Sequence, residues 1–207
     1  MSTPEGDPAI EDIAGRLAEH GYVVAHHFIG NALVGALRSE CDRLEREGCF
    51  RPAGIGSGGD ARVREDIRGD RICWIEPGTS VLAVTQVLAR FDALRLAVNR
   101  AMFLGLLDFE CHFARYVAGA GYQRHYDQFR GNNRRQLTVT LYLNEGWRDD
   151  YGGQLRVYLD DQDPGRVLQI TPTAGTMVAF LSADYAHEVM PCSRTRLSMT
   201  GWFLRRD

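Results

Sequence analysis

The stretch QLTVTLYLN, from Gln136 to Asn144, decides the fold that the sequence predicts. Leucine and valine alternate in it with threonine and tyrosine, which is the two-residue period of a β-strand with two different faces. One face carries Leu137, Val139, Leu141 and Leu143, and the other carries Thr138, Thr140 and Tyr142. Hydroxyl groups that face a shared interior would line a pocket. We therefore expect a core on one side of this strand and a pocket on the other.

Two further segments alternate in the same way, one before this strand in the sequence and one after it. In Arg196–Phe203 the polar face holds Arg196, Ser198, Thr200 and Trp202, opposite Leu197, Met199 and Phe203. In Phe109–Val117, His112 and Tyr116 lie opposite Phe109, Cys111 and Phe113. Turn residues separate the strands over 144–153 and 159–167. Short antiparallel strands that curl into a jelly roll are the simplest arrangement of this pattern.

Apolar residues at helical spacing dominate the first half of the chain instead. The spacing predicts a helix from Ile10 to Leu17 that ends before Gly21, and a short strand over 22–25. A second helix is expected between Asn31, as its N-cap, and Gly48. Residues 72–75 form a short strand, and 79–88 with 91–104 form a helical pair or one bent helix. Helices followed by strands predict an α+β fold that is mainly β.

Composition favours a single domain over residues 1–207, with helical support in 1–107 and the jelly roll in 108–207. The 207 residues are 44% hydrophobic, which is enough for one core. A net charge of -3 gives no general attraction to nucleic acid or to an anionic membrane, so neither is an expected partner. The start is short and acidic, and no apolar run has the length of a signal or membrane segment, so we expect a cytoplasmic protein. The sequence does not predict the oligomeric state.

Five cysteines, an odd number without a C-x-x-C pair, argue against a disulfide framework and a structural zinc site. We expect them to be reduced and mostly buried. The segment Gly54–Asp60 (GIGSGGD) is rich in glycine, which predicts a mobile loop but not a phosphate site. Arginines and acidic residues then alternate in sequence up to Arg71. These charges fit either a solvated segment or a finger that contacts the substrate.

His125-Tyr126-Asp127, followed by His187, forms a candidate metal site. Two neutral imidazoles and one carboxylate on a face leave three positions open, which is the pattern of non-haem Fe(II) oxygenases. A separation of two residues puts His125 and Asp127 on the same side of a strand. Each histidine alone would fit a core or surface role as well. A zinc hydrolase would also use three ligands and an open position, but it does not need the arginine that follows.

Arg196 is that arginine, and its partner is missing from the sequence pattern. A buried guanidinium favours a bidentate carboxylate, yet no acidic residue shares its alternating face. A carboxylate of a bound ligand is therefore the expected partner. Iron with a carboxylate-bearing cosubstrate is the preferred interpretation of the site.

These residues carry a family resemblance that covers well over half of the chain. The pieces are Tyr116 with GAGYQRHYD (119–127), YLN (142–144), GGQLRVY (152–158), HEV (187–189), RLSMTGWF (196–203) and, upstream, IRGDRICWIE (67–76). Together they resemble the prolyl-hydroxylase branch of the Fe(II)- and 2-oxoglutarate-dependent dioxygenases. Within that branch they are similar to the hypoxia-inducible-factor prolyl hydroxylases and their bacterial relatives. The resemblance implies a double-stranded β-helix fold.

The resemblance also implies roles for individual residues. His125, Asp127 and His187 would bind iron, and Arg196 with Tyr142 would hold the distal carboxylate of 2-oxoglutarate. Tyr116 would lie beside the metal-bound end of that cosubstrate. The pocket would be lined by Thr138, Leu155, Val189, Thr200 and Trp202, although packing explains each of these equally well. His112 departs from the apolar residue of the animal enzymes and is expected near the cosubstrate rather than as a fourth ligand.

Substrate contacts are expected in the finger from Gly54 to Trp74 and at the start of a core strand. The residues are Arg68, Asp70, Trp74, Arg134 and Arg135. The resemblance implies that Asp70 pairs with an arginine, for which Arg134 and Arg135 are both open. A mobile element that closes over an extended peptide favours a protein substrate.

The resemblance implies that dioxygen and 2-oxoglutarate are consumed to hydroxylate a prolyl residue, releasing succinate and carbon dioxide, with ascorbate as a reductant. Because bacterial relatives modify a switch loop of elongation factor Tu, that protein is the leading substrate hypothesis. Free amino acids or small peptides are the alternative substrates. A non-catalytic metal- and 2-oxoglutarate-binding sensor is a second alternative, and a nucleic-acid demethylase is disfavoured by the acidic charge. Oxygen sensing depends on kinetic constants that a sequence does not contain.

Overall fold

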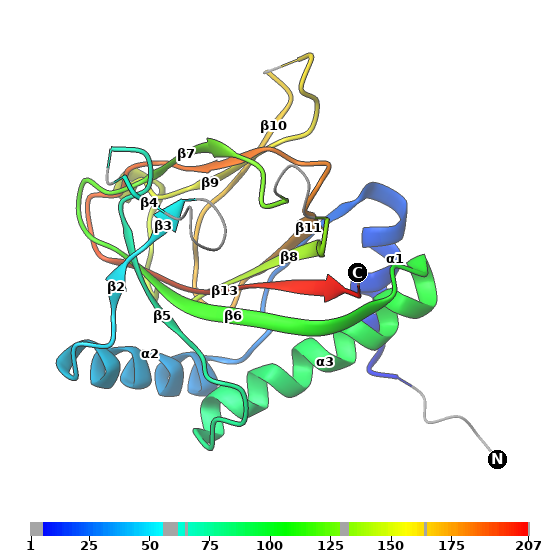
Figure 1. Cartoon of the computed structure of the whole chain (residues 1–207), viewed down its shortest axis with the longest axis horizontal. Helices are drawn as coiled ribbons and strands as arrows, with labels where there is room; N and C mark the ends of the chain where they lie inside the picture. The colour runs from blue at the N-terminus through cyan, green and yellow to red at the C-terminus, as the bar shows by residue number, and fades with distance from the viewer. Residues whose placement is uncertain (1–5, 56–61, 65, 129–132, 164, 207) are drawn as a thin grey trace.

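The computed structural model describes residues 6–55, 62–64, 66–128, 133–163 and 165–206, and it consists of two facing antiparallel sheets with helices on one side (Figure 1). The larger sheet has the strand order β1-β11-β8-β13-β6-β5-β2, and the smaller one has the order β10-β9-β12-β7. This arrangement confirms the predicted α+β fold with a jelly-roll core.

The larger sheet contains strands from both halves of the chain. Its members are β1 (Tyr22–Ala25), β2 (Arg51–Pro52), β5 (Asp70–Trp74), β6 (Leu106–Tyr116), β8 (Arg135–Tyr142), β11 (Met177–Leu181) and β13 (Arg196–Arg205). The smaller sheet contains β7 (Tyr122–His125), β9 (Leu155–Tyr158), β10 (Val167–Ile170) and β12 (His187–Val189). A separate hairpin pairs β3 (Gly54–Ile55) with β4 (Arg62–Val63), and a short 3₁₀ helix, η2, covers Asp149–Tyr151.

Three helices, α1 (Pro8–His20), α2 (Asn31–Arg46) and α3 (Leu82–Met102), lie with the larger sheet, away from the smaller one (Figure 1). α1 begins at an Asp7 cap whose carboxylate accepts a hydrogen bond from the Ala9 amide, and it ends at Gly21 in the left-handed conformation. α2 has Gly30, not Asn31, at its N-cap, so Asn31 is its first helical residue. α3 is one helix, which settles the open choice between a pair and a single helix.

The two faces of β8 are used as the alternation predicts. Leu137, Val139 and Leu141 pack into a core that also contains the buried faces of the helices. Tyr142 belongs to a second apolar cluster, which lies between the two sheets. Both faces of β8 are therefore buried, one by helices and the other by the smaller sheet.

The segment that precedes β5 connects the two sheets. The Gly69 amide donates to the Gly121 carbonyl and the Gln123 amide donates to the Ile67 carbonyl, so 67–69 extends the smaller sheet beyond β7. β5 itself then pairs with β6 in the larger sheet. Of the mobile loop predicted for Gly54–Asp60, the first two residues are instead strand β3, because their backbone pairs with β4. The remainder of that prediction, like Glu65, lies outside the described residues.

Candidate active site

A cavity of about 260 Å³ lies between the two sheets, and its walls come from strands of both. Side chains from β6, β8 and β13 form one wall, and side chains from β7, β9 and β12 form the other. His125, Asp127 and His187 lie in this cavity with Arg196. The inward-facing polar residues that the alternation picked out therefore meet at one place.

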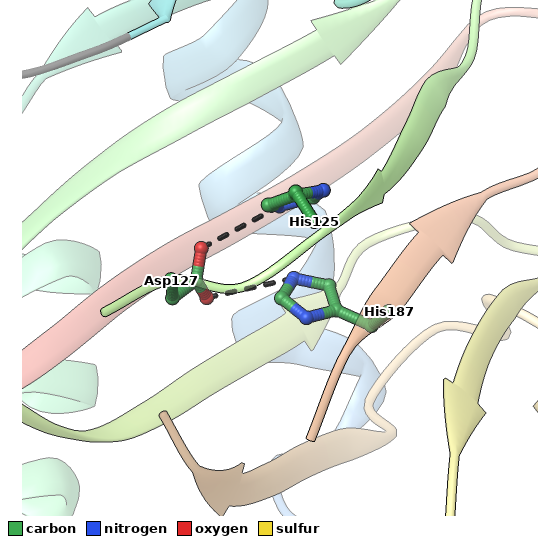
Figure 2. Close-up of side chains that lie close together, drawn as sticks. All are labelled: His125, Asp127 and His187. Atoms are coloured by element: carbon green, nitrogen blue, oxygen red, sulfur yellow. Dashed lines mark ion pairs between the residues drawn. The ribbon is translucent and has the colours of Figure 1, made fainter. Parts of the chain in front are cut away.

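The candidate metal centre is built by two neighbouring strands of the smaller sheet (Figure 2). His125 ends β7 and faces His187 of β12 in the strand register, and Asp127 follows two residues later. One ligand atom from each residue lies within 4.8 Å of the others. His125 Nε2 is 3.6 Å from Asp127 Oδ1, and His187 Nε2 is 3.5 Å from Asp127 Oδ2. This spacing allows all three groups to bind one ion.

Neighbouring groups fix the orientation of these ligands. The Nδ1 atom of His125 is 2.8 Å from the Gln123 carbonyl oxygen, and that of His187 is 3.3 Å from the Tyr185 carbonyl oxygen. With Nδ1 bound to a carbonyl, each ring presents its Nε2 atom toward Asp127. Thr138 donates a hydrogen bond of 2.8 Å to Asp127 Oδ2. Such outer contacts are typical of metal ligands, whose direction and basicity they set.

The protonation states also suit a cation. Burial, together with the neighbouring His125, lowers the pKa of the His187 imidazole to about 4, so the ring is neutral near pH 7. Burial by itself would raise the pKa of the Asp127 carboxyl group. The imidazoles of His187 and His125 outweigh burial and hold that pKa below its ordinary value. Neutral imidazoles and an ionised carboxylate are the forms that bind a divalent metal.

The residues of the larger sheet that line the cavity form rows across its strands, because the strand register pairs them. Trp202 lies beside Thr138 nearest the metal ligands, and Thr200 lies beside Thr140 in the next row. His112 of β6 extends that second row, between Thr200 and Trp74 of β5. The last row places Tyr116 between Asp70 and Arg196.

Arg196 is 1% exposed, and its Nε atom donates to the Gly153 carbonyl at 2.9 Å. Its guanidinium carbon lies 5.1 Å from the Tyr116 ring centre and 5.0 Å from that of Tyr142. Within the described part of the chain no carboxylate forms an ion pair with Arg196. Gly153 has φ +70°, and a Cβ atom there would come within 3.1 Å of Arg196 Cδ, so glycine leaves the room that the arginine occupies.

Tyr142 adds a second unsatisfied group at this end. Its side chain is fully buried, and its hydroxyl group has no hydrogen-bond partner among the described residues. Burial raises the pKa of this hydroxyl group to about 12, although Arg196 opposes the rise, so it retains its proton. A buried donor beside a buried cation without a counter-ion is the arrangement that a ligand carboxylate completes.

Among the residues that line the cavity, Asp70 pairs with Arg68 in this structure, and the pairing with Arg134 or Arg135 that the resemblance implies stays a prediction. Arg68 Nε and Nη2 donate to the two Asp70 oxygens at 2.7 and 3.1 Å, and Nη1 donates to the Gly54 carbonyl. The two arginines that the sequence left open have other partners. Arg135 binds Glu110 at 2.8 Å and stacks on Trp202, whereas Arg134 lies 3.8 Å from Asp108. Arg68 is closer to Asp70 in the sequence than Arg134 and Arg135 are, and it lies in the segment that joins the two sheets.

The sequence-derived residues mostly lie around this one cavity. Its lining includes the three candidate ligands, Arg196, Tyr116, Thr138, Thr200, Trp202, Leu155, Val189, Arg68, Asp70, Trp74 and Arg135. Tyr142 lies behind the wall against Arg196, and Arg134 does not line the cavity. Two aromatic residues beside the candidate ligands were not predicted from the sequence. The ring centre of Tyr122 is 3.6 Å from that of His125, and the ring centre of Phe180 is 4.7 Å from that of His187. Tyr122 lies within the GAGYQRHYD motif, where its aromatic ring next to a candidate ligand was the available signal.

A two-histidine, one-carboxylate site inside a jelly roll is characteristic of non-haem iron oxygenases. The family model of the 2OG-Fe(II) oxygenase superfamily matches residues 111–204. A solved prolyl-4-hydroxylase from Pseudomonas putida is 48% identical, with a TM-score of 0.86, and the match covers 96% of this chain and 100% of that one. This chain therefore belongs to the 2OG-Fe(II) oxygenase superfamily, in the branch that contains prolyl hydroxylases.

Two other relatives bear on the branch. A Trichoplax adhaerens prolyl hydroxylase, solved with a peptide fragment of the hypoxia-inducible-factor oxygen degradation domain, is 26% identical with a TM-score of 0.83. That match covers 95% of this chain and 91% of the Trichoplax chain. Human Egl nine homolog 1 is 29% identical over 96% of this chain, which spans 47% of the human protein's length.

Proposed function

We propose that this chain hydroxylates a prolyl residue of a protein substrate with Fe(II), 2-oxoglutarate and dioxygen. The observation that carries the proposal is one cavity with two unsatisfied sets of groups. His125, Asp127 and His187 converge at one side of the cavity. Arg196 lies elsewhere in the same cavity and has no carboxylate ion-pair partner among the described residues. An iron ion and a dicarboxylate cosubstrate would satisfy both. Strands from both halves of the chain build the larger sheet, which supports treating residues 1–207 as a single catalytic domain.

The chain's own groups would bind and orient these reactants. His125, Asp127 and His187 hold the metal, while Thr138 keeps the Asp127 carboxylate in position. Arg196 and Tyr142 would bind the distal carboxylate of 2-oxoglutarate, and Tyr116, which lies beside Arg196, would pack against the cosubstrate. Leu155 and Val189 exclude water from the cosubstrate, with Thr200 and Trp202 completing the wall. When bound, iron supplies the oxidising chemistry that converts 2-oxoglutarate and dioxygen to succinate and carbon dioxide as the prolyl residue gains a hydroxyl group.

A loop of elongation factor Tu is the proposed substrate. Two features support a polypeptide substrate of this kind. Arg68, Asp70, Trp74 and Arg135 line the cavity from strands β5 and β8 and the segment before β5, and Trp74 among them is half-exposed. The solved Trichoplax relative holds a peptide. Such a substrate would place the reaction in the cytoplasm, and ascorbate would serve as the external reductant. No helix in the described ranges is both long and apolar enough to span a membrane.

The decisive experiment incubates the purified chain with Fe(II), 2-oxoglutarate and intact elongation factor Tu. We expect a mass gain of one oxygen on a switch-loop proline, with one succinate formed for each hydroxylation. His187→Ala is the matched inactive control. Hydroxylation of free proline or of short peptides alone would replace the protein substrate by a small one. Uptake of metal and 2-oxoglutarate without turnover of any prolyl substrate would refute the enzyme assignment in favour of a binding module.

A further inference from the structure

His112 is a buried polar residue whose ring nitrogens lack hydrogen-bond partners of normal geometry among the described residues. Its side chain is 1% exposed, yet neither ring nitrogen has a hydrogen-bond partner among the described residues. A buried polar group without a partner costs free energy that an apolar side chain of the same size would not. A metal role does not explain it, since the group that can hold an ion comprises His125, Asp127 and His187. A ligand that supplies hydrogen-bond partners for the two ring nitrogens would explain the buried histidine.

His112 lies in the cavity wall beside the half-exposed Trp74. In the strand register it lies between Trp74 and Thr200, and its ring centre is 5.1 Å from that of Trp74 and 5.5 Å from that of Trp202. Trp74 is the last residue of β5 and of the finger, and it is 47% exposed. The charged groups that act on the imidazole are Arg68, Asp70 and Arg135, all of which line the same cavity.

The charge state of His112 narrows the ligand chemistry. Burial, assisted by the positive charge of Arg68, lowers the pKa of the imidazole to about 4. The neutral ring carries one N–H donor and one acceptor nitrogen. A carboxylate offers acceptors only and would leave the second nitrogen unpaired. A peptide group offers both a carbonyl oxygen and an N–H, so it can satisfy both nitrogens.

We propose that His112 is a specificity-determining residue that hydrogen-bonds a main-chain peptide group of the polypeptide substrate, next to the residue that is hydroxylated. This inference rests on the proposed function. Both ring nitrogens are shielded from solvent in the free protein, so the substrate reaches them by displacing the half-exposed Trp74 indole. His112 thereby favours a polypeptide over a free amino acid at the same metal centre.

The test compares His112→Leu, which fills a similar volume without polar atoms, with His112→Gln, which retains one donor and one acceptor. The protein is loaded with Mn(II) and 2-oxoglutarate so that no turnover occurs. Binding of a fluorescein-labelled elongation factor Tu switch-loop peptide is then followed by anisotropy. We expect His112→Leu to weaken peptide binding about tenfold, and His112→Gln to recover most of the loss. The dissociation constant of 2-oxoglutarate should stay within twofold in both variants.

A stability measurement separates recognition from a structural role. Because the nitrogens have no partner in the free protein, His112→Leu should raise the melting temperature or leave it unchanged. The control His20→Leu, at an exposed helix end, should alter neither binding constant. Unchanged peptide affinity, a selective loss of 2-oxoglutarate affinity, or a lowered melting temperature in His112→Leu would each overturn the role of His112 while the proposed function stands. Wild-type protein that neither binds nor hydroxylates the peptide would overturn the proposed substrate, and this role with it.

Discussion

Replacing Arg196 should separate cosubstrate binding from folding more sharply than any other change. The guanidinium is buried and has no ion-pair partner in the described chain, so its charge is uncompensated in the free protein. Truncating one partner of a buried, hydrogen-bonded charge pair costs roughly 2–5 kcal/mol of binding free energy. At 1.4 kcal/mol per tenfold, Arg196→Met should weaken 2-oxoglutarate binding by about 30- to 5,000-fold.

The stability cost of the same change should be small. Arg196→Met removes the 2.9 Å hydrogen bond to the Gly153 carbonyl and the contacts with Tyr116 and Tyr142. A hydrogen bond from a charged donor contributes roughly 1.5–3 kcal/mol, and each cation–π contact contributes about 1 kcal/mol. Removing a buried charge without a partner offsets part of this loss. We expect the free energy of unfolding to fall by less than about 2 kcal/mol.

Calorimetry of 2-oxoglutarate with Mn(II)-loaded protein measures the binding constant, and urea unfolding of the metal-free protein measures stability. Arg196→Lys keeps the charge without the planar fork and should fall between wild type and Arg196→Met. Arg194→Met is the matched control, because Arg194 is exposed and stacks on Tyr151 away from the cavity. A binding constant within threefold of wild type in Arg196→Met would refute the carboxylate role of Arg196.

Three further changes test the metal centre and its surroundings. Thr138→Val removes the 2.8 Å hydrogen bond to Asp127 and should weaken Mn(II) binding about 10- to 100-fold in a calorimetric titration, whereas Thr85→Val on the exposed face of α3 should not. Divalent metal should raise the melting temperature of the wild-type protein, and a chelator should reverse this effect. The variant His187→Ala should not show the rise. A rise that persists in the variant would argue against His187 as a ligand. Acid should destabilise the metal-free protein, because His112 and His187 have pKa values of about 4 when folded but about 6.5 when unfolded, so the unfolded chain takes up protons first as pH falls below 6.5. For His112 the loss of unfolding free energy between pH 6.5 and 4 is on the order of 3 kcal/mol, and His112→Leu should show a correspondingly smaller loss in urea titrations at both pH values.

The sequence by itself determined the strands and their faces. The two-residue period of Leu137 to Tyr142 depends only on backbone geometry, and the same holds for the polar face of Arg196, Thr200 and Trp202. The candidate ligands followed from residue type and spacing, and the resemblance located the cosubstrate groups. The family comparison and the two-sheet structure confirm the family and the fold class, and the roles of the individual ligand and cosubstrate residues stay predictions.

Tertiary structure alone decided which side chains meet across long stretches of chain. The partner of Asp70 is Arg68 because the segment before β5 passes from one sheet to the other and brings the two charges together. Similarly, two strand pairings set the positions of Trp74, His112 and Thr200 in one row, and the sequence pattern does not specify register between distant strands. Alternation is a local property of the backbone, whereas partners depend on register and on loop paths. For that reason the missing partner of His112 became visible only in the folded chain.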